Sequence, residues 1–130
     1  MPTLSYVNIF ASDIDRLADF YSRLLDLEEI VESRTPLYRG FRCGGASLGF
    51  SAMDAYEILA LQRPEGQGER NVITFDVDDQ AEVRRLVAAA SSMGASILKE
   101  PFETYYGWYQ AVLRDPEGNA FRLNFPGKAA

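Results

Sequence analysis

The sequence contains no histidine, and this absence excludes more chemistry than any other feature of its composition. Without imidazole, neither a Ser-His-Asp nor a Cys-His catalytic arrangement can form, and a His-ligated metal site is excluded as well. Cys43 is the only cysteine, so the chain cannot form an internal disulfide. Because no histidine is present to activate its thiol, we interpret Cys43 as a small buried apolar residue.

Long apolar runs and an excess of basic residues are also missing. No run approaches the roughly 18 residues of a membrane helix, and residues 1–10 lack the charged and apolar regions of a signal peptide. The formal net charge of −6 argues against nonspecific nucleic-acid binding, which needs clustered Lys and Arg. We therefore expect a cytoplasmic protein without a nucleic-acid or membrane partner.

The 130 residues, of which 47% are hydrophobic and 25% charged, suit one domain with a real core. Within this length the order of predicted elements occurs twice. A strand over 4–10 precedes a helix over about 13–25 that Ser12 or Asp13 caps, and short strands follow at 27–33, 37–43, 46–52 and 57–62. After a polar, Gly-rich linker at 63–70, a strand over 71–77 precedes a helix capped by Asp78 or Asp79 and ended at Gly94, with strands at 96–100, 108–114 and 120–125.

An offset of 65 positions superposes the two halves, placing Val7 on Val72, Phe10 on Phe75 and Asp13 on Asp78. We read this as an internal repeat. The prediction is an α+β fold of tandem βαβββ modules, module one at 1–64 and module two at 71–130, within a single domain. Their strands are expected to form a curved, barrel-like mixed sheet around a cleft, with the helices outside.

Three segments resemble the vicinal oxygen chelate superfamily, which groups glyoxalase I, extradiol dioxygenases and bleomycin-resistance proteins. They are YVNIFASDIDRLADFYSRLLDLE (6–28), NVITFDVDD (71–79) and YGWYQAVLRDPEGNAFRL (106–123). The DPEGN stretch (115–119) within the last segment is interpreted as a structural turn. The resemblance implies the fold, and it implies a homodimer, because family members often pair.

Metal-dependent members of that superfamily use up to four ligand positions, usually His, Glu or Gln. The resemblance places these positions on Tyr6, Gly49, Asn71 and Arg122. Glycine has no side chain and arginine brings a fixed positive charge that repels a cation. We therefore expect neither a metal site nor another cofactor, and the resemblance implies the fold without the usual chemistry.

Alternation along the strands nominates a set of ligand-binding side chains with aromatic, amide and cationic character. The candidates are Tyr6, Asn8, Gly49, Asn71, Tyr105, Trp108, Gln110 and Arg122. Each has a structural alternative. Arg122 anchors an organic anion, forms a structural ion pair across the cleft, or points to solvent if the strand register slips by one residue. Tyr6 donates a hydrogen bond or proton to the ligand, or it is a core aromatic. The aromatic segment 104–110 stacks on a planar ligand, or it packs in the core or a dimer interface.

The preferred hypothesis is a metal-free protein that binds a small aromatic or anionic molecule, as bleomycin-resistance-like proteins sequester drugs. A second hypothesis is a metal-independent lyase or isomerase with Tyr6 as the acid and Glu57 or Glu103 as the base. The third is a non-catalytic dimerising module. A carboxylate with a raised pKa beside Tyr6 would favour the enzyme.

Overall fold

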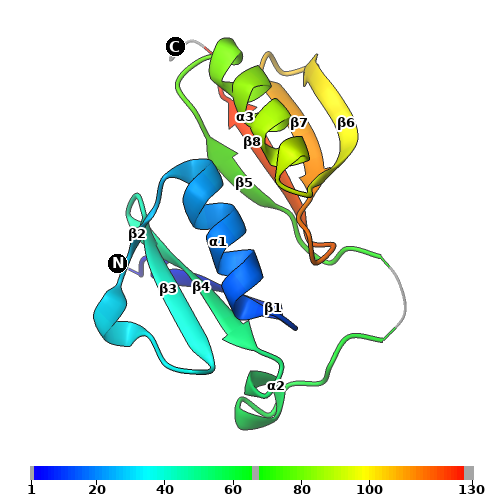
Figure 1. Ribbon diagram of the computed structural model, residues 1–130. Helices are drawn as coiled ribbons and strands as arrows, with labels where there is room; N and C mark the ends of the chain where they lie inside the picture. The colour runs from blue at the N-terminus through cyan, green and yellow to red at the C-terminus, as the bar shows by residue number, and fades with distance from the viewer. Residues whose placement is uncertain (1, 66–67, 128–130) are drawn as a thin grey trace. The chain divides into compact units, whose positions relative to one another are not determined.

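The computed structural model describes residues 2–65 and 68–127, which fall into two compact units, unit 1 (Met1–Gly66) and unit 2 (Gln67–Ala130). Each unit contains one four-stranded mixed sheet with a helix packed on one face, so the α+β prediction is confirmed (Figure 1). The predicted linker at 63–70 includes residues 66–67, which lie outside the described residues. No helix in the described ranges is long and apolar enough to span a membrane.

Unit 1 has the strand order β1-β4-β3-β2, in which β1 is parallel to β4 and the other neighbours are antiparallel. Its elements are β1 (Tyr6–Ala11), α1 (Ile14–Leu25), β2 (Glu28–Glu29), the 3-10 helix η1 (Val31–Ser33), β3 (Tyr38–Cys43), β4 (Ala46–Ala52) and α2 (Ala55–Ile58). The two-residue connection Gly44–Gly45 joins β3 to β4, and Gly44 adopts φ 59 as such a turn requires.

Helix α1 begins where the sequence predicts, because the Asp13 side chain accepts a hydrogen bond from the Arg16 backbone N at 3.1 Å. Its apolar face buries Leu17, Ala18, Phe20, Tyr21 and Leu24. Tyr21 stacks on Phe50 of β4 with ring centroids 5.5 Å apart, so Phe50 faces the helix. Since side chains alternate along a strand, the neighbour Gly49 lies on the opposite, helix-free face of the sheet.

Unit 2 has the corresponding order β5-β8-β7-β6, again with one parallel pair, β5 with β8. Its elements are β5 (Ile73–Asp76), α3 (Gln80–Ser92), β6 (Ser96–Glu103), β7 (Tyr109–Arg114) and β8 (Ala120–Phe125). Asp79, not Asp78, caps α3 by accepting from the Glu82 backbone N at 2.8 Å. Gly94 follows the C-cap residue with φ 99, as predicted for the end of this helix.

The DPEGN stretch forms the predicted turn between β7 and β8. Asp115 is buried, and its Oδ1 accepts from the backbone N of Glu117 at 2.9 Å and of Asn119 at 3.0 Å. Gly118 adopts φ 92, which a side chain would disfavour. The turn thereby fixes the β7–β8 register, in which Gln110 lies opposite Asn124 and Val112 opposite Arg122.

The outer strand of unit 2, β6, pairs only with β7 and is irregular. Its register shifts between Ile97 and Lys99 and again between Lys99 and Phe102, and Pro101 lies within the second interval. Such bulges and an edge proline are typical of strands that have a neighbour on one side only.

The structure corrects two expectations. Residues 57–62 are not a strand: Ala55–Ile58 form the short helix α2, and the residues that follow it join neither sheet. The repeat offset is 66 rather than 65, since the helix caps are Asp13 and Asp79. Val72, not Asn71, therefore takes the place that Tyr6 has in unit 1, and Phe75 corresponds to the buried Ile9 rather than to Phe10.

Candidate functional site

The helix-free face of unit 1 carries a directly opposed pair of glycines, Gly40 on β3 and Gly49 on β4, beneath two tyrosine rings. A Cβ atom at Gly49 would lie 2.7 Å from the Tyr38 hydroxyl oxygen and 2.8 Å from Tyr6 Cε2. A Cβ atom at Gly40 would lie 2.5 Å from the same Tyr38 hydroxyl. The absence of side chains at both positions leaves room for the two rings close to the sheet, because a Cβ atom at either position would collide with them.

The two tyrosines contact each other edge to face, with centroids 6.1 Å apart. Burial, and then a hydrogen bond with Tyr6, raise the pKa of the Tyr38 hydroxyl. Tyr38 therefore keeps its proton at neutral pH and can donate it in a hydrogen bond, while its ring offers apolar contact. The Tyr6 side of this pair is reachable, since Tyr6 is 45% exposed.

Polar and aromatic groups continue along the same face. Ser51 Oγ donates to Asn8 Oδ1 at 3.0 Å, so the predicted candidate Asn8 is held by a neighbouring strand. Phe10 stacks on Tyr56 of α2 with centroids 4.0 Å apart. Three of the predicted candidates, Tyr6, Asn8 and Gly49, are thus brought together on one surface of unit 1.

The residues on the helix-free face of unit 2 are identified from their strand neighbours, which point toward helix α3. Tyr109 reaches α3, where its hydroxyl accepts from Arg84 Nη1 at 3.3 Å, so Gln110 lies on the side away from the helix. Phe121 packs against Phe75 in the helix-side core, so its neighbour Arg122 also lies on the helix-free face.

Arg122 is positioned by Thr74, its direct neighbour on β5. Arg122 Nε donates to Thr74 Oγ1 at 2.8 Å, and Arg122 makes no ion pair with the described residues. Arg122 is one of three described arginines that are buried or half-buried, and the other two have carboxylate partners: Arg39 binds Glu29, and Arg114 binds Glu69. The structural alternative for Arg122, an internal ion pair, is therefore not formed within the described part of the chain.

A row of polar side chains lies beside Arg122 on the same face. Gln110, Asn124 and Asp76 occupy directly opposed positions on β7, β8 and β5. Asn124 Nδ2 donates to Asp76 Oδ1 at 2.9 Å. Asn124 is 0% exposed and Gln110 is 5% exposed. The Oδ1 atom of Asn124 and the Oε1 atom of Gln110 are buried and accept no hydrogen bond from the described residues.

The remaining candidates of unit 2 lie at its ends. Trp108 directly precedes β7 and alternates onto the side of Gln110; its backbone N donates to Thr104 Oγ1 at 2.9 Å. Its ring contacts Tyr106 with centroids 5.2 Å apart, whereas Tyr105 is fully exposed. Asn71 is exposed and precedes β5, outside the paired residues of the sheet.

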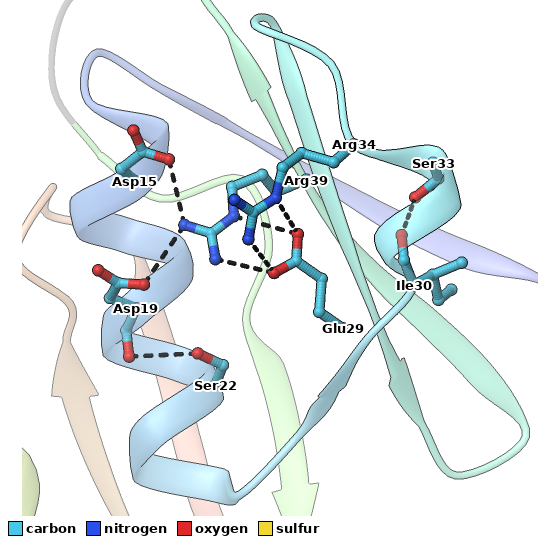
Figure 2. A network of polar contacts seen from close by, with 8 residues as sticks. All are labelled: Asp15, Asp19, Ser22, Glu29, Ile30, Ser33, Arg34 and Arg39. Carbon is cyan, nitrogen blue, oxygen red and sulfur yellow. Dashed lines mark hydrogen bonds and ion pairs between the residues drawn. The ribbon is translucent and has the colours of Figure 1, made fainter.

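A cluster of charged side chains that pair with one another lies on the helix side of unit 1. Arg39 is 8% exposed and binds Asp15, Asp19 and Glu29 through nitrogen–oxygen distances of 3.1, 3.3 and 2.9 Å (Figure 2). Hydrogen bonds from Arg34 and then Arg39 lower the pKa of Glu29 to about 2. The network ties α1 and β2 to β3, so its role is structural.

The donors at the four superfamily ligand positions do not fit a divalent cation. Gly49 contributes no donor, Arg122 is cationic and Tyr6 is a neutral phenol, while the position nominated as Asn71 lies before β5. Within residues 2–65 and 68–127, no group of three or more His, Cys, Asp or Glu side chains is placed to hold a metal. Divalent ions need several anionic or imidazole ligands, which these positions lack.

Neither carboxylate proposed as the base of the acid–base hypothesis is buried in the structure. Glu57 is exposed and pairs with Arg63 at 2.9 Å, and Glu103 is exposed at the end of β6. Where a described carboxyl group has a clearly shifted pKa, at Glu29 and Glu82, the shift is downward. Cys43 is half-buried and not buried as expected, and its partial burial raises the pKa of the thiol.

A two-module fold with these helix-free faces defines a class of protein, and comparison with known sequences names it. The model of the glyoxalase/bleomycin resistance protein/dioxygenase superfamily matches residues 3–123. The chain belongs to this superfamily, as the resemblance of its sequence segments predicted. Comparison with curated proteins gave no match.

Solved structures agree with this assignment. A family enzyme from Burkholderia phytofirmans PsJN is 45% identical, with a TM-score of 0.91 over 96% of this chain and 99% of that one. A lactoylglutathione lyase from Agrobacterium tumefaciens is 21% identical, with a TM-score of 0.72 over 95% and 92% of the two chains. The fosfomycin resistance protein FosX from Mesorhizobium loti is 16% identical, with a TM-score of 0.72 over 96% and 92%. The last two matches show the shared fold alone.

Sequence reasoning missed Tyr38, Gly40 and Thr74 as parts of these faces. Gly40 could have been predicted from the sequence. The two-residue connection Gly44–Gly45 sets the register of the β3–β4 hairpin. That register places Gly40 opposite Gly49. Thr74 carried no comparable signal, since its link to Arg122 depends on the parallel pairing of strands far apart in the sequence.

Proposed function

We propose that this protein binds a small organic anion with an aromatic or apolar body, and that it does so without a metal. The observation that carries the proposal is Arg122: a partly buried arginine on a helix-free sheet face, oriented through its Nε and without a carboxylate partner among the described residues. Its two terminal nitrogens can donate to both oxygens of a carboxylate, which is the strongest hydrogen-bond geometry arginine offers.

Each unit by itself offers aromatic surface. In unit 2, the indole of Trp108 lies at the end of the strand that carries Gln110. In unit 1, a separate candidate surface is formed by the rings of Tyr6 and Tyr38, which cover the glycine pair and present hydroxyl groups. Aromatic surface with a few oriented polar groups is the usual composition of a small-molecule site. Sequestration, as in the bleomycin-resistance branch of the superfamily, needs no further group, and the homodimer remains part of the proposal.

The test is a calorimetric titration of metal-stripped protein with phenylacetate and with mandelate, two aromatic acids that carry one carboxylate. We expect saturable binding that Arg122→Met weakens by about 10–100-fold, because a charge-assisted bidentate contact is lost. Arg114→Met is the matched control, since Arg114 lies on the same sheet and is already paired with Glu69. It should leave the affinity unchanged.

Native mass spectrometry of freshly purified protein complements the titration, because it reports subunit count, retained metal and any co-purified organic adduct together. A metal-free dimer carrying a small acid supports the proposal. Equal affinities of the wild type and Arg122→Met, or binding that appears only when zinc, nickel, manganese or iron is added, would overturn it.

A further inference from the structure

Two buried acceptors without a hydrogen bond lie beside Arg122, and they indicate a second functional group on the ligand in addition to its anion. This inference rests on the proposed function. We propose that the ligand of unit 2 is a hydroxy acid: its carboxylate meets Arg122, and a hydroxyl near that carboxylate shares its single proton between Asn124 Oδ1 and Gln110 Oε1 in a three-centre hydrogen bond. Both acceptors are buried and accept no hydrogen bond in the described chain. Buried polar atoms without partners are rare and are destabilising where they occur, so they point to a missing donor.

The arrangement of the acceptors suits a single donor group. Gln110 and Asn124 are directly opposed on β7 and β8, so their side chains leave the sheet next to each other. Arg122 is two residues from Asn124 along β8 and lies on the same face. A strand rises about 3.3 Å per residue, which separates the Arg122 and Asn124 backbone positions by roughly 7 Å. The long arginine side chain can cover part of this span, so an anion and a hydroxyl a few bonds apart can engage both.

The donor is expected to be a neutral hydroxyl and not an ammonium group. Asn124 and Gln110 are 0% and 5% exposed, and transferring a charged ammonium to such a place is far more costly than transferring a hydroxyl. The amide nitrogen of Asn124 is already used, because it donates to Asp76 at 2.9 Å, and this contact fixes which way the Asn124 oxygen points. Asn124 is therefore preset as an acceptor.

Because the two oxygens accept no hydrogen bond from the described residues, a ligand hydroxyl does not have to break one within the protein. A site with unpaired polar atoms discriminates strongly against a ligand that lacks the donor. We expect mandelate, which has a hydroxyl next to its carboxylate, to bind about tenfold tighter than phenylacetate, which differs only by lacking that hydroxyl.

The experiment compares the two acids on the full chain by calorimetry, with Gln110→Met as the test variant and Gln80→Met as its control. Methionine keeps the length of Gln110 and removes the acceptor, whereas Gln80 is exposed at the start of α3. The mandelate preference should fall severalfold in Gln110→Met and persist in Gln80→Met, with thermal melting showing that both variants fold. The Asn124 position is left intact because its substitution would strip Asp76 of its partner.

The outcomes separate this inference from the proposed function. Equal affinity of the wild type for the two acids, with both affinities lost in Arg122→Met, would overturn the hydroxy-acid inference and leave the anion proposal standing. It would mean that the Gln110 amide turns and donates to Asn124 Oδ1 itself. A preference that Gln110→Met leaves unchanged would also overturn the inference. Failure of both acids to bind would remove the anion proposal and the hydroxy-acid inference together.

Discussion

The phenol of Tyr38 lies over Gly49, so close that a Cβ atom at Gly49 would be 2.7 Å from the Tyr38 hydroxyl oxygen. The resemblance of the sequence to its superfamily assigns one of the metal-ligand positions to Gly49. In this chain that position has no side chain and is covered by the two tyrosine rings.

Gly49→Ala should destabilise unit 1 by about 1–2 kcal/mol, because both tyrosine rings must move to admit the methyl group. Urea unfolding measures the change. Gly45→Ala is the matched control, since a Cβ atom there meets nothing within 4 Å. In a Tyr38→Ala background the cost of Gly49→Ala should be markedly smaller, and an equal cost in both backgrounds would contradict the contact as the cause.

Thr74→Val should weaken the binding of phenylacetate by about 3–10-fold, because Arg122 Nε loses the acceptor that orients the guanidinium group. Valine matches threonine in shape, so the free energy of unfolding should change less than the affinity. Thr74→Ser keeps the hydroxyl and should restore binding. Calorimetry measures both variants, and an unchanged affinity in Thr74→Val would show that Arg122 does not need this neighbour.

The stability of unit 1 should fall in acid through Glu29. Its pKa is lowered from 4.5 to about 2 by hydrogen bonds from Arg34 and then Arg39, so the folded state favours the charged carboxylate. This contribution is fully present above pH 4.5 and is lost as the pH falls through about 2. We expect it to be on the order of 1–3 kcal/mol, since Glu29 is largely but not wholly shielded from solvent.

Glu29→Gln should therefore flatten the decline in the free energy of unfolding between pH 4.5 and 2, as followed by urea titration at several pH values. Glu28→Gln is the control, because the side chain of Glu28 is 78% exposed and pairs only loosely with Arg42 at 3.4 Å. A pH dependence as steep in Glu29→Gln as in the wild type would assign the acid sensitivity to other carboxylates.

Asp79→Ala should cost about 1 kcal/mol of stability, because the hydrogen bond to the Glu82 backbone N at the start of α3 is lost. Asp78→Ala should cost almost nothing, since Asp78 is exposed and does not cap the helix. The two neighbouring variants can be compared by thermal melting. The opposite order of their effects would contradict the repeat offset of 66.

Much of the fold could be predicted because local chemistry and distant packing agree. Asp13 precedes an apolar face of helical period, and the DPEGN turn combines a buried aspartate acceptor with a glycine of positive φ. The false strand at 57–62 arose where local pattern and packing disagree: its apolar residues Ile58 and Leu59 are 70% and 54% exposed, and the segment pairs with no strand of the described chain. Local pattern cannot reveal whether a neighbour is free.

The candidate residues were harder to predict than the fold. Arg122 and Gln110 could be placed on one face from alternation and the turn between their strands. Asn71 was mapped by an offset that was wrong by one residue, and in a strand such a shift turns every side chain to the other face. The Arg39 network was not foreseen either, since a buried arginine is identified by its partners on α1 and β2, which lie apart in the sequence.

The irregular strand β6 also bears on how this protein behaves at high concentration. A strand that presents evenly spaced backbone groups at its outer edge can recruit the same strand from another molecule and begin a fibril. Two register shifts and Pro101 interrupt that spacing in β6, and Lys99 and Glu100 add exposed charge. At the corresponding edge of the other sheet, β2 is only two residues long. These two edges are poor templates for fibrils, so any sheet extension would have to occur at β1 or β5.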